Sequence, residues 1–183
     1  MAVHASRLLV LALAAALAAC SGSGMNWFGR SDSTGATPRE VPGVETRLVP
    51  LGSGINGMVR VRESGDLLVV RADFGNLMPG VEYRIVFHEN GNCSSPNGFS
   101  AGAPWSPPGF KGNPAQMIPV VRASTEGNGI ITARLRGVSL GGPTGLVKRS
   151  VIVYQGFDAQ PIKPDVRNNA AACGVFQPAT SLF

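Results

Sequence analysis

The sequence predicts an all-β domain, built as a β-sandwich or a flattened β-barrel. Apolar and polar residues alternate with a period of two in several short runs, as at residues 59–62, 83–88 and 131–136, which is typical of strands with one buried face. Turn-forming clusters such as Ser-Gly-Asp at residues 64–66 separate these runs. No stretch after residue 20 keeps a helical period for three turns, and the many Gly and Pro residues also disfavour helices.

The pattern predicts eight strands in chain order. They are expected near residues 46–51, 56–63, 67–74, 82–88, 117–123, 130–136, 148–154 and 171–176. Two connections, residues 89–116 and 155–169, are long and rich in turn-forming residues. Connections of this length are usually functional or covered by another part of the fold. Short strands with a few long connections favour a Greek-key topology.

Residues 1–19 predict a bacterial lipoprotein signal peptide. Arg7 precedes an apolar run at residues 8–16 that is too short to span a bilayer, and the motif Leu-Ala-Ala-Cys ending at Cys20 resembles a lipobox. We therefore expect cleavage before Cys20 and acylation of Cys20, which would anchor the chain stably in a membrane. The alternative is a plain secretory signal with an incidental cysteine. The residue after Cys20 is Ser21 and not Asp. By resemblance to sorted lipoproteins, this favours the outer membrane of the bacterial cell envelope, with the chain facing the periplasm.

The remaining chain predicts a tether followed by one domain. Residues 20–43 comprise the candidate lipidated cysteine and a segment rich in Ser and Gly, which is typical of a flexible tether. Residues 44–183 have the size of one ordinary domain. This domain contains Cys93 and Cys173, and an exported chain with one cysteine pair most simply forms one disulfide. A thiol metal pair is the alternative.

The charges are mildly basic and scattered. Removal of Arg7 with the signal leaves fifteen of the sixteen Lys and Arg residues against eleven Asp and Glu residues. No basic run with interleaved aromatic residues is present, so we expect no nucleic-acid partner. We interpret the arginines as the solvated faces of strands.

Six segments, taken in order, resemble the copper/zinc superoxide dismutase family. They are GMVRV (57–61), GDLLVVRADFGNLMPG (65–80), VFHENGNC (86–93), SAGAPWSP (100–107), RSVIVY (149–154) and AACGVF (171–176). The resemblance covers most of the domain and implies a Greek-key β-barrel. It also implies a disulfide that ties the long connection at Cys93 to the last strand at Cys173.

The family's metal ligands are mostly missing from this sequence. The resemblance aligns the copper positions with Val86, His88, Pro104 and Tyr154, of which only His88 is a histidine. The zinc positions fall within residues 110–120, which contain no His and no Asp. Redox-active copper needs several nitrogen ligands and zinc needs four donors. We therefore expect a family member without dismutase activity and without a metal cofactor, and copper binding is the alternative.

Two interpretations of His88 remain open. It is either a residual metal ligand, together with Tyr154, or a histidine that is hydrogen-bonded beneath the connection 89–116 and holds that connection in place. In the second case Tyr154 fills the space of a missing ligand and hydrogen-bonds to His88. Likewise, Trp105 and Phe110 form either an exposed recognition patch or a cap over the barrel's open face.

The sequence thus predicts a superoxide dismutase-like lipoprotein of the envelope that acts as a binding or structural module. Its expected partners are the membrane, through Cys20, and an unidentified envelope protein or a second copy of the chain. The second hypothesis is a superoxide dismutase or copper-binding protein with an altered site centred on His88. A third is an unrelated β-barrel lipoprotein, such as an inhibitor of a host hydrolase.

Overall fold

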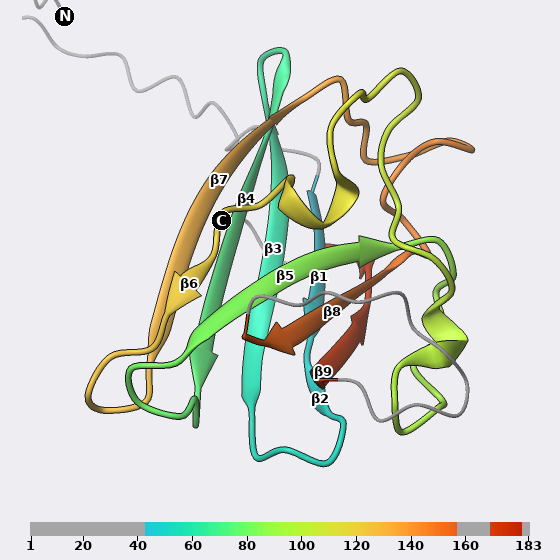
Figure 1. Cartoon of the computed structure of the whole chain (residues 1–183). Helices are drawn as coiled ribbons and strands as arrows, with labels where there is room; N and C mark the ends of the chain where they lie inside the picture. The colour runs from blue at the N-terminus through green and yellow to red at the C-terminus, as the bar shows by residue number, and fades with distance from the viewer. Residues whose placement is uncertain (1–42, 157–168, 181–183) are drawn as a thin grey trace, which may run out of the picture. The chain divides into compact units, whose positions relative to one another are not determined.

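A computed structural model of the chain describes residues 43–156 and 169–180. These residues form two five-stranded antiparallel sheets that pack face to face (Figure 1), so the prediction of an all-β sandwich is confirmed. Among them, no helix is long and apolar enough to cross a bilayer. The predicted signal peptide, Cys20, the tether up to residue 42 and most of the connection 155–169 lie outside the described residues.

The first sheet has the strand order β10-β1-β3-β4-β7. Its strands are β1 (Gly43–Arg47), β3 (Asn56–Ser64), β4 (Leu67–Gly75), β7 (Gly129–Arg136) and β10 (Gln177–Pro178). The second sheet has the order β2-β9-β8-β5-β6. Its strands are β2 (Val49–Pro50), β5 (Glu82–His88), β6 (Val121–Arg122), β8 (Ser150–Gln155) and β9 (Ala170–Val175). Two short 3₁₀ helices, η1 (Phe99–Ala101) and η2 (Pro114–Gln116), lie between β5 and β6.

The period-two pattern explains the core between the sheets. Every second residue of a strand points inward, and the buried cluster formed there includes Val59, Val61, Val70, Ala72, Ile85, Phe87, Val151, Val153 and Phe176. The intervening residues of β3, β4 and β7 are mostly exposed or half-buried. Burial of these apolar side chains supplies the main stabilisation of the fold.

The second sheet is buried on both faces. On the side away from the core, residues of β5 and β8 meet Ala101 and Ala115, which belong to the connection 89–116. The residues that form this second cluster from the strands are Val86, Ile152, Tyr154, Ala170 and Cys173. The connection therefore covers the outer face of this sheet, which accounts for its length. It also explains why β8 is almost continuously apolar instead of alternating.

The β-barrel that the resemblance implies is not closed, because no strand pairing joins the two sheets within the described ranges. The strand predicted at 117–123 is reduced to the two residues of β6. Pro119 cannot donate to a ladder, and the segment before it forms η2, whose first turn is capped by the Asn113 side chain.

The strand predicted at 46–51 is divided between the sheets. Its first part is β1 in the first sheet and its last part is β2 in the second. Leu48, which lies between them, is buried in the core. Its amide donates to Gly57 O in the first sheet, whereas the amide of Leu51 donates to Ala171 O in the second. The chain therefore crosses the sandwich at Leu48, and the described residues contain ten strand segments instead of eight.

Candidate functional site beneath the long connection

The candidate site lies on the outer face of the second sheet, at the end of β5. His88 is the last residue of β5, and Tyr154 lies on the neighbouring strand β8. Both side chains point away from the core between the sheets, yet both are covered by the connection 89–116. Their exposed fractions are 0% for His88 and 1% for Tyr154. The site is therefore a closed interior position and not a surface cleft.

Both ring nitrogens of His88 are engaged by protein groups. Nδ1 lies 2.8 Å from the carbonyl oxygen of Gly102, and Nε2 lies 3.0 Å from the hydroxyl oxygen of Tyr154. A carbonyl oxygen can only accept, so Nδ1 carries the hydrogen and Nε2 of the neutral ring accepts from the Tyr154 hydroxyl. The hydrogen bond between Tyr154 and His88 that the second interpretation of His88 expects is therefore present.

Burial keeps both groups neutral. It lowers the pKa of His88 below its ordinary value of 6.5, because the charged imidazolium would lose its hydration. It raises the pKa of Tyr154 above its ordinary value of 10.0 for the same reason, since the phenolate is the charged form. A neutral hydroxyl donating to a neutral imidazole is the pairing that these two shifts favour.

The donor set around His88 is poor in metal ligands. The Nδ1–H bond to a backbone carbonyl is the orientation that metal-binding histidines use, and it leaves Nε2 as the ligating atom. Here, however, the lone pair of Nε2 accepts from Tyr154, and Val86 on the same face offers no donor. Across residues 43–156 and 169–180, no three His, Cys, Asp or Glu side chains lie close enough together to hold a metal ion.

The other positions aligned with copper ligands are also brought to this region. Pro104 forms an isolated antiparallel bridge with His88, and the flanking bonds are Trp105 N to Phe87 O at 2.7 Å and Glu89 N to Ala103 O at 3.0 Å. The returning segment 103–105 thus pairs with the end of β5.

Trp105 and Phe110 have different environments. The Trp105 ring is only 6% exposed and packs 6.5 Å from Phe87, centroid to centroid. Trp105 therefore caps the core and does not form a recognition patch. Phe110 is 39% exposed and lines an open groove of about 440 Å³ with Met117 and Val138.

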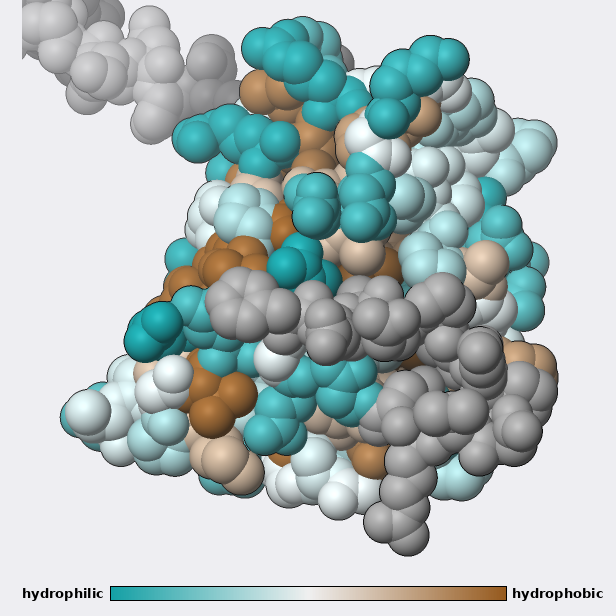
Figure 2. All heavy atoms as spheres, viewed as in Figure 1, coloured by the Kyte–Doolittle hydropathy of each residue, from teal (hydrophilic) through white to brown (hydrophobic). Residues whose placement is uncertain are grey.

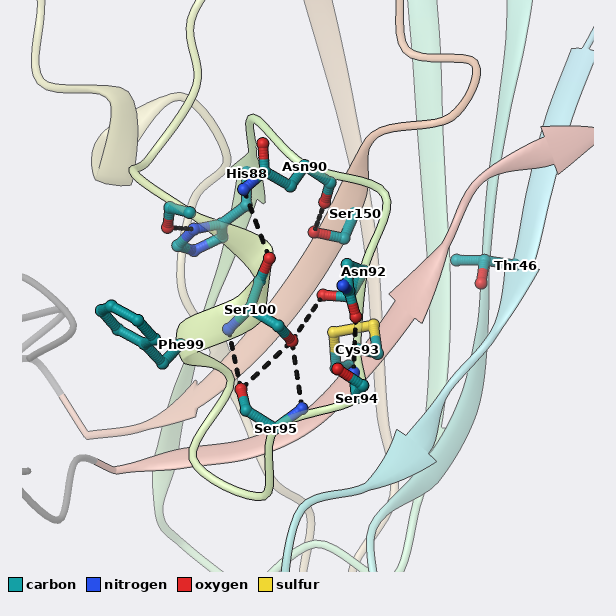
Figure 3. The surroundings of a disulfide bond; sticks show 12 residues. Thr46, His88, Asn90, Asn92, Cys93, Ser94, Ser95, Phe99, Ser100 and Ser150 are labelled. Atoms are coloured by element: carbon teal, nitrogen blue, oxygen red, sulfur yellow. Dashed lines mark hydrogen bonds between the residues drawn. A yellow bond between two sulfur atoms is a disulfide. The ribbon is translucent and has the colours of Figure 1, made fainter. Parts of the chain in front are cut away.

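The disulfide ties the connection to the second sheet. Cys93 and Cys173 are bonded, with their Cα atoms 5.8 Å apart and a sequence separation of 80, so the predicted disulfide is confirmed. Figure 3 shows the hydrogen bonds next to it. Ser100 Oγ donates to Asn92 O at 3.1 Å, and the amide of Ser100 donates to Ser95 Oγ at 2.7 Å. The connection is therefore ordered by its own polar groups.

Arg149 and Ser150 add contacts that the sequence did not reveal. The Arg149 guanidinium donates to three carbonyl oxygens, those of Gly145, Glu89 and Pro143, at 2.7, 3.1 and 3.0 Å, and it lies 4.5 Å from the centre of the Trp105 ring. Ser150 Oγ donates to the carbonyl oxygen of Asn90 at 2.6 Å. These side chains fasten the start of the connection to β8. No sequence signal identifies them, because their partners are backbone carbonyls.

No protein-family model matches the chain, and a search of curated proteins gives no significant match. The resemblance to copper/zinc superoxide dismutases therefore enters the functional interpretation as a hypothesis.

Proposed function

We propose that this protein is a lipid-anchored module of the bacterial cell envelope, similar in fold to copper/zinc superoxide dismutases but without dismutase activity. It acts by binding or by supporting structure. The observation that carries the proposal is the His88–Tyr154 hydrogen bond, because it uses the lone pair that a metal would need. The lipid anchor at Cys20 is part of the proposal and lies outside the described residues.

Three structural observations support the family relationship. First, β7 pairs with β4 although β5 and β6 come between them in sequence, which is a Greek-key order. Second, the disulfide links the long connection to β9, as the resemblance implies. Third, the positions aligned with the copper ligands, among them His88, Pro104 and Tyr154, lie together on one side of the second sheet.

The chemistry of the site argues against dismutation. A copper ion that cycles between two oxidation states needs several nitrogen donors to fix its geometry. His88 is the one imidazole in the described part of the chain, and its partner Tyr154 is a buried phenol whose raised pKa opposes the phenolate that could bind a metal.

A second candidate function is copper binding at an altered site centred on His88. The observation in its favour is the Nδ1–H bond to Gly102 O, which presents Nε2 toward Tyr154 as a metal-binding histidine would present it to a metal. This function requires Tyr154 to lose its proton or to rotate away.

One experiment separates the two functions. The full, untagged protein is purified from a Gram-negative host, exposed to excess Cu(II), dialysed, and analysed for copper content and for superoxide consumption, beside the His88→Gln variant. The proposal expects no stoichiometric copper and no superoxide consumption in either protein. Stoichiometric copper with superoxide turnover in the wild type, both lost in His88→Gln, would overturn it. Mass spectrometry of Cys20 tests the lipid anchor separately.

A further inference from the structure

The outer face of the first sheet carries most of the arginines of the described chain. Strand alternation sends one set of side chains of β1, β3, β4 and β7 outward, and all of them are exposed or half-buried. The basic members of this set are Arg47, Arg60, Arg62, Arg71, Arg134 and Arg136. We call this surface the arginine face. The outer face of the second sheet, in contrast, is covered by the connection 89–116.

The strand register places these arginines in rows. Arg62 on β3 and Arg134 on β7 both lie opposite Val69 on the strand between them. Arg60 lies opposite Arg71 in the next row. Because neighbouring strands are about 4.8 Å apart, the Arg62 and Arg134 backbones are separated by roughly 10 Å across the sheet. The arginine face is therefore a two-dimensional array of cations and not a single ion pair.

Ion pairs neutralise only part of this array. Asp73 pairs with Arg71 at 3.0 Å and with Arg60 at 3.5 Å, and Glu45 lies 3.9 Å from Arg60. In contrast, Arg62 and Arg134 have no carboxylate within ion-pair distance among the residues that the structure describes. The face thus has a positive excess, and its uncompensated charges flank Val69.

A small cavity lies within the array. Arg60, Arg62 and Arg71 line it together with Val69 and Thr132, and its volume is about 160 Å³. Guanidinium groups offer several N–H donors in a planar fork that suits the oxygens of phosphate and carboxylate groups. The bonds to Asp73 hold Arg71 in place, which reduces the conformational entropy lost when an anion binds.

Apolar side chains among the arginines favour a lipid surface over a small soluble anion. Ile130 is 62% exposed at the end of β7, and Val69 and Met58 are half-buried on the same face. Arginines next to exposed aliphatic side chains suit the boundary between headgroups and acyl chains, where the guanidinium stays in the polar layer.

The chain connectivity favours the same partner. The first residue of β1 is Gly43, which lies opposite Arg62 in the register, so the described chain begins in the same row as Arg62. The 23 residues from Cys20 to the start of β1 span at most roughly 80 Å even when fully extended. A lipid at Cys20 would thus keep the domain close to the membrane and raise its effective concentration there. This step, unlike the preceding ones, rests on the proposed lipid anchor.

We propose that the arginine face docks on an anionic lipid surface, with Arg62 and Arg134 contacting the phosphate groups of the headgroups. Electrostatic attraction supplies most of the binding, and Ile130 inserts at the boundary with the acyl chains.

The test uses the chain from Ser21 to Phe183, which keeps every described residue and lacks Cys20, so that the result does not depend on lipidation. Its sedimentation with phosphatidylglycerol vesicles is compared with its sedimentation with phosphatidylcholine vesicles. The double variant Arg62→Glu/Arg134→Glu is compared with Lys111→Glu/Lys148→Glu, which changes the net charge equally at exposed positions elsewhere. Near-UV and far-UV circular dichroism verify that each variant is folded.

The wild type is expected to bind phosphatidylglycerol vesicles, and the Arg62/Arg134 variant to bind them at least about 30-fold more weakly, since each cation near an anionic surface contributes roughly fivefold. The Lys111/Lys148 variant is expected to bind nearly as well as the wild type. Salt is expected to release both of these proteins from the vesicles because it screens exposed charges.

Absence of binding to phosphatidylglycerol, equal loss in the two double variants, or binding insensitive to salt would overturn the proposal. Binding to soluble polyglutamate but not to vesicles would also overturn it and indicate an acidic protein partner. None of these outcomes bears on copper content or on the mass of Cys20, so failure here is distinct from failure of the proposed function.

Discussion

The hydrogen bond between Tyr154 and His88 makes a quantitative prediction for Tyr154→Phe. The substitution keeps the ring and removes only the hydroxyl, which donates to His88 Nε2 over 3.0 Å. Because the site is closed to solvent, the imidazole nitrogen then remains buried without a donor. Leaving a buried acceptor unsatisfied costs about 1–3 kcal/mol. We therefore expect a loss of about 2 kcal/mol, equivalent to a fall in Tm of about 4–8 °C for a domain of this size.

The assay is urea and thermal unfolding at neutral pH, followed by circular dichroism. The matched control is Tyr83→Phe, in which the lost hydroxyl accepts from the amide of Met78 at 2.9 Å. Met78 is 56% exposed, so water can replace that bond, and we expect a loss below about 1 kcal/mol.

Equal destabilisation in the two Tyr→Phe variants would refute this reasoning, because it would mean that the Tyr154 hydroxyl is not needed by His88. An increase in stability of Tyr154→Phe would refute it more strongly. Either result would reopen the interpretation of His88 as a metal ligand, since its Nε2 would then be free in the folded protein.

Three further predictions concern the same region. Because burial lowers the pKa of His88 below its ordinary value of 6.5, the unfolded chain takes up a proton at a higher pH than the folded chain does. The free energy of unfolding, measured by urea unfolding, should therefore decrease as the pH falls below 6.5. It should decrease less over the same pH range in His88→Gln. Cys93→Ser/Cys173→Ser should lower the free energy of unfolding by about 4–5 kcal/mol, and a loss under about 1 kcal/mol in urea unfolding would contradict the chain-entropy argument. Gly102→Ala should lower Tm more than Gly109→Ala, although both glycines have positive φ, 77° and 80°. An added Cβ at Gly102 would lie 2.7 Å from the side-chain nitrogen of Asn90, which would have to move and give up its bond to Ser100 O, whereas a Cβ at Gly109 meets no atom within 4 Å. Equal shifts would exclude this crowding as the cause.

The long strands of the fold follow from the sequence, because strand alternation is a local property. The runs predicted at 56–63, 67–74 and 82–88 agree with β3, β4 and β5 to within one residue at each end. The errors occur where contacts between residues distant in sequence determine which sheet a strand joins. The segment 46–51 has a continuous strand pattern, but the burial of Leu48 sends its two halves to different sheets, and nothing in the segment itself indicates that crossing.

The candidate site was predictable only in part. The resemblance brought His88 and Tyr154 together, and the structure joins them by a hydrogen bond. The partner of Nδ1 was not predictable, because Gly102 contributes only its carbonyl oxygen. The same holds for the guanidinium of Arg149, whose acceptors are all backbone carbonyls. Which carbonyl lies within reach depends on the path of the whole connection and not on the identity of the residue that carries it.

The contacts of the connection explain how protein groups hold it over His88. The connection is fastened by the disulfide at Cys93, by Arg149 and by the bond from Ser150 Oγ to Asn90 O, and none of these contacts involves a metal. The Tyr154 hydroxyl, on β8, donates a hydrogen bond to Nε2 of His88, and the Gly102 carbonyl, in the connection, accepts one from Nδ1. A buried polar group costs stability only when it is unpaired. The His88–Tyr154 pair is therefore a hydrogen-bonded, closed position, as the proposal of a binding or structural module requires.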